Sequence, residues 1–387
     1  MRNLILESGE RFPLLVNDVG TPVHGPTVYC VAELRNRHRA ANTIANAISA
    51  LSIFQNFLDE NAIDLAQRLE EGKLLELGEI EELVSACRID RSAQEQDAPP
   101  VTSAVCATRI RTIRNYLEWL VKGRLLGRDY PHVKLLQRIS DLTRDTMNAR
   151  IPPASSPFDP PEGLEPQSIQ YAADAFEPNS SLNPWVDAHT RARNHLIWLI
   201  LRHLGIRSGE LLGIRIRNIS FREGTLSILR QADAPDDPRR RQPNTKTRAR
   251  VLEISDVLQR TLSDYIHNHR SKVRKAKSHD FLFVSRSGAP LSRAGLDKAF
   301  TVLRKKNPEL PGNLTPHILR HTWNDAFSEE ADIRKLDPET EKRVRSYQMG
   351  WNPTSRAAEV YTRRSVRKKA QEVSLAFQKR LLERIDS

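Results

Sequence analysis

Residues 314–323 read LTPHILRHTW, and residues 350–364 read GWNPTSRAAEVYTRR. The first segment places His317 and Arg320 three residues apart, so both side chains share one face if the segment is helical. The second segment contains the phenol of Tyr361, with three arginines close to it in sequence. A cationic anion site beside a tyrosine suggests phosphate chemistry in which the tyrosine is the nucleophile.

The composition indicates a basic protein of about two domains. At 387 residues the chain is longer than a typical single core, and its net charge is +12. An excess of this size favours a polyanionic partner, usually nucleic acid. The alternative is a basic surface that only keeps the protein soluble. The charged fraction of 28% and the aromatic fraction of 6% indicate modest cores with large solvated faces.

Cysteine usage and hydropathy indicate the compartment. Cys30, Cys87 and Cys106 are scattered, and no pair has the spacing of a zinc site. We therefore expect reduced cysteines in the core, no metal and no cofactor. The start of the chain becomes charged too early for a signal peptide, and no apolar run approaches the roughly 18 residues of a membrane span. The expectation is a cytoplasmic, nucleoid-associated protein with no membrane partner.

The first half of the chain predicts a short arm followed by a helical domain. Residues 1–34 read as an irregular N-terminal arm with at most one short strand, and residues 35–148 as a helical DNA core-binding domain. Within that domain, residues 102–123 predict a long helix with one apolar side. Its other side carries the candidate DNA contacts Arg109, Arg111, Arg114 and Lys122. These side chains either contact phosphates or are simply solvated.

A proline-rich segment, residues 149–166, separates this domain from the second half, because proline disfavours interior helix and strand hydrogen bonds. Residues 167–364 predict a domain of helices with strands near 219–221, 225–230 and 250–254. Residues 365–387 predict a C-terminal helix. The expected fold class is mainly α with a small antiparallel β-sheet.

Phosphodiester displacement needs fixed donors aimed at the non-bridging oxygens, and arginine supplies a planar fork for this role. Arg320 is one candidate. The second is Arg207 in GIRSGELLGIR (205–215), which follows Gly205 at the start of a predicted short helix. Glu210 lies one turn later and can brace Arg207. The alternative for Arg207 alone is a surface arginine after a helix-ending glycine.

The leaving oxygen needs a proton, and the nucleophile must lose one. Lys246 lies on a polar loop among many arginines that would lower its pKa, so it can act as a general acid. The alternative is a solvated hairpin tip. The neighbouring Arg248 is a further candidate DNA contact. His317 can accept a proton or bind the phosphate, and the indole N–H of Trp351 can donate one hydrogen bond. Tyr361 needs positive charge or a base nearby.

The order Arg207, Lys246, His317-x-x-Arg320, Trp351 and Tyr361 resembles the tyrosine recombinase (phage integrase) family. The matching segments are LGIRSGELLGIRIRNI, TKTRARVLEI, LTPHILRHTW and MGWNPTSRAAEVYTRR. They span roughly residues 165–365, whereas the helical first half resembles the family's core-binding domain more weakly.

The resemblance implies a C-shaped clamp on duplex DNA and a 3′-phosphotyrosyl link to Tyr361. It implies that Arg207 and Arg320 bind the scissile phosphate and that Lys246 protonates the 5′ oxygen, with His317 and Trp351 assisting. No ATP or metal is implied. It also implies a cyclic homo-tetramer on two duplexes, with a monomer possible without DNA, in which the C-terminal helix docks either on its own subunit or on a neighbour.

Two features differ from the family pattern. Most members carry histidine where Trp351 stands, and the ten-residue spacing from Trp351 to Tyr361 is one longer than usual. Two alternatives to a strand-exchange enzyme therefore stay open: a non-catalytic DNA-binding relative, and a type IB topoisomerase-like enzyme.

Overall fold

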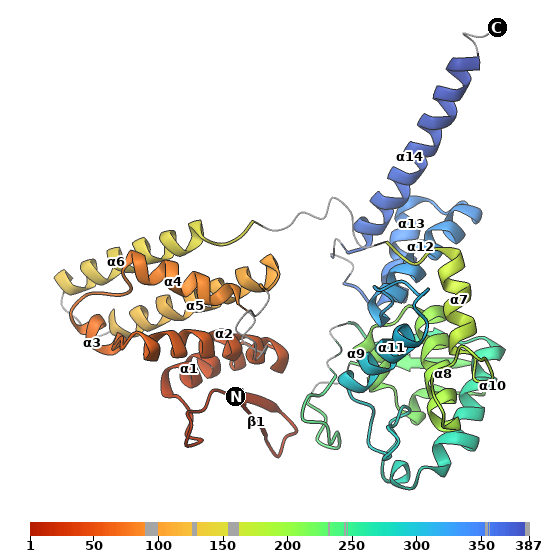
Figure 1. Ribbon diagram of the computed structural model, residues 1–387, viewed down its shortest axis with the longest axis horizontal. Helices are drawn as coiled ribbons and strands as arrows, with labels where there is room; N and C mark the ends of the chain where they lie inside the picture. Colours follow the sequence, from red (N-terminus) through yellow and green to blue (C-terminus); the bar gives the residue numbers. More distant parts are fainter. Residues whose placement is uncertain are drawn as a thin grey trace. The chain divides into compact units, whose positions relative to one another are not determined.

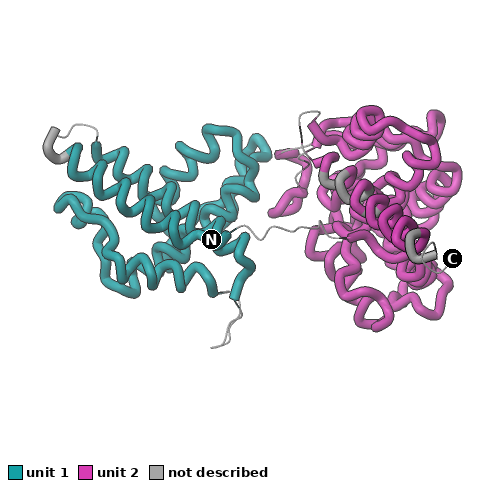
Figure 2. Tube along the Cα trace, turned by 90° about the horizontal axis from the view of Figure 1, so that it is seen from above, with its two compact units in different colours: residues 1–156 teal, residues 157–387 magenta. Residues whose placement is uncertain are grey.

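The computed structural model describes residues 1–89, 100–125, 130–153, 162–230, 233–243, 245, 247–352, 355 and 357–383. The chain divides into two compact units, residues 1–156 and residues 157–387 (Figure 2). The point of division falls inside the proline-rich segment.

Unit 1 begins with a hairpin. Strands β1 (Arg2–Ile5) and β2 (Arg11–Leu14) pair antiparallel. Every residue of β2 is buried, and Phe12 and Leu14 join the core of the helices that follow. The prediction of an irregular arm is therefore wrong. The sequence gives no strand alternation here because β2 is covered on both faces.

The rest of unit 1 is helical (Figure 1). Helix α1 (His24–Tyr29) continues as the π-helix η1 (Cys30–Arg35) and is followed by α2 (Ala41–Glu60), α3 (Leu65–Glu70), α4 (Leu77–Arg88), α5 (Ser103–Leu125) and α6 (Tyr130–Ala149). The side chains of Ile48, Leu51, Leu83 and Ile110 are fully buried between these helices. All three cysteines are buried, and none forms a disulfide with another described residue.

Unit 2 packs helices around a three-stranded antiparallel sheet (Figure 1). Strands β3 (Ile219–Ser220), β4 (Thr225–Ile228) and β5 (Arg250–Glu253) pair in sequence order, with Leu226 opposite Leu252. The helices are α7 (Pro166–Phe176), α8 (Ala188–Leu204), α9 (Ser208–Gly213), α10 (Asp256–Asp264), α11 (Arg293–Lys306), α12 (Pro316–Ile333), α13 (Pro338–Met349) and α14 (Ala357–Glu383). Unit 2 also contains the 3₁₀ helices η2 (Ile216–Asn218), η4 (Arg270–Lys272) and η5 (Arg274–Ser278) and the π-helix η3 (Tyr265–His269).

The fold class predicted from the sequence is confirmed: the chain is mainly α, with a small antiparallel sheet. The predicted break at residue 365 differs from the structure, because α14 runs without interruption through that position and carries Tyr361 in its first turns. Among the described helices, none combines the length and the apolar character that crossing a membrane requires.

Helix starts and ends in unit 2 follow local chemistry. Thr315 caps α12 by accepting from the N–H of Ile318, and Pro316 occupies its first position. Gly205 ends α8 with a φ of +59°, and Gly350 ends α13 with a φ of +65°. A Cβ on Gly205 would lie 2.7 Å from the Trp323 ring. Glycine therefore lets the chain turn sharply just before Arg207 and just before Trp351.

Candidate active site

Arg320 lies at the centre of the site and is 3% exposed. Its guanidinium donates to the carbonyl oxygen of Gly205 at 2.8 Å and to that of Met349 at 3.2 Å. Both carbonyls belong to helix C-termini, where the backbone dipole is negative and stabilises a cation. The side chain is thus fixed without a carboxylate, and its positive charge stays available to an anion.

Arg207 lies directly after the turn at Gly205 and precedes α9. Its backbone N–H donates to Glu210 Oε2 at 2.7 Å, so Glu210 braces the segment through the main chain. Glu210 also pairs with Arg250, at 2.9 Å, and accepts from the hydroxyl of Thr247. Both partners of this ion pair have side chains that are 1% exposed, so it is a buried structural link.

The Glu210–Arg250 pair connects α9 to the end of α13. Arg250 Nε donates to the carbonyl of Gln348 at 2.7 Å, and the N–H of Arg248 donates to the carbonyl of Gly350 at 3.0 Å. Gly350 must remain without a side chain here, because a Cβ would lie 2.5 Å from Arg250 Nη1. These contacts fix the position of Trp351, the next residue.

Trp351 and Tyr361 stack, with ring centroids 5.7 Å apart and an interplanar angle of 13°. Both side chains are 8% exposed, and Arg320 lies over the indole ring at 5.4 Å. Tyr361 therefore occupies the site of its own chain. The longer spacing after Trp351 does not move the tyrosine away from the arginines. Part of the intervening segment, residues 353, 354 and 356, lies outside the described residues.

Two histidines of α12 connect to the phenol. Tyr361 Oη lies 3.0 Å from His321 Nδ1, and His321 Nε2 lies 3.1 Å from His317 Nε2. The spacing of four residues places both rings on one face of the helix. His317 was a candidate from the sequence, and His321 was not. The signal available in the sequence was the histidine directly after Arg320, the predicted phosphate ligand.

Arg345 of α13 supports the tyrosine from another side. It is fully buried and donates to the carbonyl of Asn324 at 2.8 Å and to Ser328 Oγ at 2.7 Å. It also pairs with Glu341 and lies 5.7 Å from the centre of the Tyr361 ring. The sequence did not predict that Arg345 links α12 and α13, because an arginine within a highly charged helix is expected to be exposed to solvent.

Burial dominates the electrostatics of the site. It lowers the pKa of Arg320 to about 9, with a further lowering by the charge of Arg207. Burial also lowers the pKa of Arg207, and it raises the pKa of Tyr361 despite the opposing effect of Arg320. The pKa of His317 is lowered by burial and then by Arg320. Positive charge alone therefore does not ionise the phenol, contrary to the simplest interpretation of its sequence neighbours.

Besides Nε of the supporting Arg345, two buried donors of this site have no partner among the described residues. They are Nη1 of Arg207 and the indole Nε1 of Trp351. Leaving a buried N–H without an acceptor is unfavourable, so such groups mark a place where a ligand atom or water binds. Together with Arg320, these donors fit the non-bridging oxygens of a phosphate.

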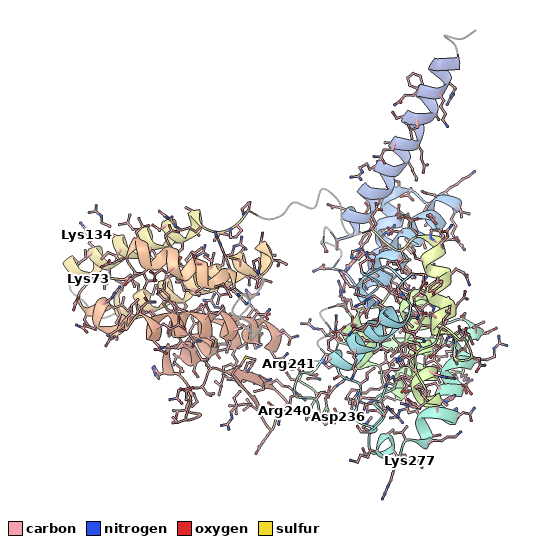
Figure 3. The ribbon with its side chains drawn as sticks, viewed as in Figure 1. Lys73, Lys134, Asp236, Arg240, Arg241 and Lys277 are labelled. Carbon is pink, nitrogen blue, oxygen red and sulfur yellow. The ribbon has the colours of Figure 1, made fainter. Side chains whose placement is uncertain are left out.

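The predicted general acid, Lys246, lies outside the described residues. Among the arginines near it in sequence, Arg239 is buried and pairs with Asp237 at 2.8 Å, and Arg250 pairs with Glu210. Arg240 and Arg241 are exposed on the same connection as Asp236 (Figure 3). Part of the predicted cationic surrounding of Lys246 is thus neutralised by ion pairs.

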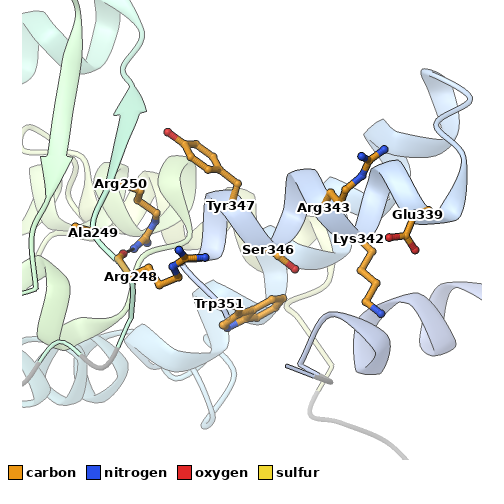
Figure 4. Close-up of a pocket in the computed structure, with 10 residues that line it drawn as sticks. Arg248, Ala249, Arg250, Glu339, Lys342, Arg343, Ser346, Tyr347 and Trp351 are labelled. Atoms are coloured by element: carbon orange, nitrogen blue, oxygen red, sulfur yellow. Dashed lines mark hydrogen bonds between the residues drawn. The ribbon is translucent and has the colours of Figure 1, made fainter. Parts of the chain in front are cut away.

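A pocket of about 540 Å³ lies beside Trp351. Arg248 and Arg250 line it from the β5 side, and side chains of α13 line it opposite (Figure 4). Arg248 is exposed, as a DNA contact must be. Tyr347 is 60% exposed and donates to the carbonyl of Val251 at 3.2 Å.

The candidate DNA contacts of α5 fall into two kinds. Arg109 donates to the carbonyls of Cys87 and Ile89, and Arg114 pairs with Glu118 at 3.6 Å. Arg111 and Lys122 are exposed, and within the described part of the chain no ion pair holds either. The former two therefore have structural partners, and the latter two are open to solvent. In the described part of the chain, no cluster of His, Cys, Asp and Glu could hold a metal ion.

Comparison with known proteins identifies related sequences over the second half of the chain. Residues 179–339 match the phage integrase family. The match includes Arg207, His317 and Arg320 and ends before Trp351 and Tyr361. The tyrosine recombinase XerD of Halalkalibacterium halodurans is 31% identical over 145 residues, which are 37% of this chain and 44% of that protein. The tyrosine recombinase XerD of Corynebacterium glutamicum is 27% identical over 177 residues, 45% of this chain and 51% of that protein.

The chain thus spans about half the length of the curated relatives it matches. Among solved structures, the XerH site-specific recombinase bound to a palindromic difH substrate, in a post-cleavage complex, superposes with a TM-score of 0.55. The superposition covers 93% of this chain and 91% of that one, at 16% sequence identity. The two chains therefore share a fold.

Proposed function

We propose that this chain is a site-specific recombinase of the phage integrase family, which its residues 179–339 match. It cuts and rejoins duplex DNA through a 3′-phosphotyrosyl intermediate. The observation that carries the proposal is the position of Tyr361, stacked on Trp351 beside two buried, unpartnered donors. A cis tyrosine next to an open cationic site favours cutting over DNA binding alone.

The contacts of Arg207, Arg320, Trp351 and Tyr361 support a role for each, whereas the role of Lys246 rests on the sequence. Arg320 and Arg207 bind the scissile phosphate, and the indole N–H of Trp351 donates to the same group. Tyr361 attacks phosphorus, and the 5′ oxygen leaves with a proton from Lys246. These charge-assisted donors stabilise the developing negative charge most strongly in a buried site. The covalent link keeps the phosphodiester energy, so the reaction needs neither ATP nor a metal.

The test is covalent trapping. The protein is incubated with nicked fragments of DNA from its source organism, and adducts that resist detergent are collected and sequenced. We expect one family of sequences, each joined by its 3′ phosphate to Tyr361. Tyr361→Phe should form no adduct. Tyr171→Phe is the matched control, because Tyr171 lies on α7 and its hydroxyl donates to Glu309 at 3.1 Å.

The outcomes separate the alternatives. No wild-type adduct, or an adduct that persists in Tyr361→Phe, contradicts the proposal. Binding to one sequence without any cleavage indicates a non-catalytic relative. Adducts without sequence preference, with relaxation of supercoils by a monomer, indicate a type IB topoisomerase-like enzyme.

The DNA-bound form is proposed to be a homo-tetramer, assembled in the cytoplasm on nucleoid DNA. The first turns of α14 pack on α12 and α13, whereas Val373 and Phe377 further along are 68% and 58% exposed. Among the described residues these apolar side chains are left exposed, which supports docking on a neighbouring subunit. Phe377→Asp should leave DNA binding by single subunits intact and abolish the tetrameric complex in sedimentation analysis. Tetramers in that variant would contradict the proposal.

A further inference from the structure

One histidine of the site has no role in the chemistry above. His321 is 6% exposed, and its Nδ1 lies 3.0 Å from the hydroxyl oxygen of Tyr361. We propose that His321 is the direct proton acceptor of Tyr361 and passes a proton on to His317. The inference rests on the proposed function, since it concerns the same nucleophile.

These two contacts permit two directions of hydrogen bonding, and the one that starts at the Tyr361 hydroxyl forms a proton relay. If Tyr361 donates to His321 Nδ1, the ring of His321 carries its own hydrogen on Nε2. That hydrogen points to His317 Nε2 at 3.1 Å. The two rings are nearly perpendicular, at 85°, with centroids 4.6 Å apart. The chain of three groups thus leads from the nucleophile to His317.

The nucleophile requires such an acceptor. Burial raises the pKa of Tyr361, so the phenol is protonated at neutral pH. The pKa of His317 is lowered by burial, by Arg320 and by Arg207, so His317 is neutral and can accept a proton. The cations that keep His317 neutral are the groups that would bind the phosphate.

The step balances as follows. The O–H bond of Tyr361 breaks as its oxygen forms a bond to phosphorus, and the proton moves to His321 Nδ1. His321 releases the hydrogen on Nε2 to His317, which becomes an imidazolium, while His321 stays neutral. The bond from phosphorus to the 5′ oxygen breaks, and that oxygen takes a proton from the general acid, assigned above to Lys246.

A modified leaving group separates this role from that of the general acid. In a DNA substrate with sulfur in place of the bridging 5′ oxygen, the leaving group departs without a proton. His321→Asn keeps a polar side chain and removes the base. We expect it to slow adduct formation about 100-fold, equally with oxygen and sulfur substrates. His267→Asn, at an exposed histidine of η3, is the matched control.

Three outcomes overturn the inference. Wild-type rates in His321→Asn exclude the role, and recovery of the rate with sulfur assigns His321 to the leaving group instead. Absence of an adduct with wild-type protein overturns both this inference and the proposed function. An adduct with wild-type protein but an unaffected His321→Asn overturns only the inference.

The pH profile adds a readout that a merely structural role would not change. The wild-type rate should fall as the pH drops and the histidine pair binds a proton, and His321→Asn should lose that dependence. The same charged groups act on His317 and Tyr361 in both proteins: Arg207 before α9, Arg293 of α11, Arg320 and Asp325 of α12, and Arg345 of α13.

A measurement on folded protein applies if the variant does not fold. Nitrogen-15 spectra of the histidines report which ring nitrogen carries hydrogen. In wild-type protein we expect Nδ1 of His321 to be an unprotonated acceptor at neutral pH, and its signal should shift in Tyr361→Phe. A protonated Nδ1, or a signal that Tyr361→Phe leaves unchanged, overturns the inference.

Discussion

Unit 2 contains buried arginines in two regions. In one region carboxylates pair with the guanidinium groups, and in the other, among the described residues, they do not. At the base of the connection between β4 and β5, Arg215 is 1% exposed and donates to Asp280 at 2.7 Å and to Asp236 at 2.5 Å. Arg239 is buried beside it and pairs with Asp237. Each guanidinium in this region has a carboxylate, so its charge is compensated within the fold.

The site around Arg320 lacks that compensation. Arg320 bonds to two backbone carbonyls, and Arg207 keeps a buried N–H with no partner among the described residues. Neither forms an ion pair with a carboxylate in the described part of the chain. The difference indicates which buried arginines hold the fold together and which are kept for an external anion.

The largest effect is expected from Arg320→Met. This variant should slow catalysis strongly without lowering the stability of the fold. Removing a donor to the transition state should slow adduct formation about 10³-fold. The folded-state pKa of Arg320 is lowered to about 9, below its ordinary value, so the buried charge destabilises the fold at pH 7, and that cost is relieved only as the pH rises above 9. Thermal melting at pH 7 should therefore show equal or higher stability in the variant.

A clearly lower melting temperature for Arg320→Met would contradict this interpretation, since it would mean that the charge is compensated in the free protein. Arg320→Lys tests whether a positive charge alone is enough for cleavage. It keeps a cation but loses the fork that holds two oxygens, so its cleavage should remain strongly reduced.

The second prediction concerns the compensated region. Arg215→Met removes the buried partner of two carboxylates and should lower the free energy of unfolding by about 3 kcal/mol. This is the lower end for a buried pair, because Asp236 and Asp280 are partly exposed. Denaturant titration measures the change. Arg217→Met is the control: its side chain is 63% exposed, and its pair with Asp280 should be worth under about 1 kcal/mol.

Much of unit 2 could be predicted from its sequence. The three strands and the helices α12 and α13 follow from apolar periodicity and from capping residues such as Thr315. Arg207, Arg320 and Tyr361 could be assigned to one site because phosphate transfer by a tyrosine nucleophile uses such groups. Trp351 could be added because the order of these residues resembles the tyrosine recombinase family. The structure brings all four together.

What could not be predicted depends on contacts between distant residues. The pair of Glu210 and Arg250 joins residues 40 positions apart and has no periodic signal. The choice between a paired and an open arginine is likewise set by tertiary packing, so Arg345 and Arg215 look like surface residues in sequence. His321 could not be predicted as a site residue because its role depends on the direction of the Tyr361 hydroxyl. Only three-dimensional packing determines that direction.

The same distinction between paired and open cations gives the smallest predicted effect, on DNA affinity. Lys122 is exposed on α5, whereas Arg109 closes the end of α4 by donating to the carbonyls of Cys87 and Ile89. A lysine that contacts phosphate releases counterions on binding. Lys122→Ala should therefore reduce the slope of log affinity against log salt by about one unit.

Arg109→Ala should leave that salt slope unchanged and instead lower the melting temperature, because two helix-terminal carbonyls lose their donor. Binding isotherms at several salt concentrations, on the DNA identified by covalent trapping, measure both variants. A reduced slope for Arg109→Ala, with no change for Lys122→Ala, would mean that Arg109 contacts phosphate and Lys122 does not. Internal hydrogen bonds would then fail to identify the structural arginines of unit 1. A flat salt response in wild-type protein would go further, since it would remove phosphate contacts as the reason for the net charge of +12.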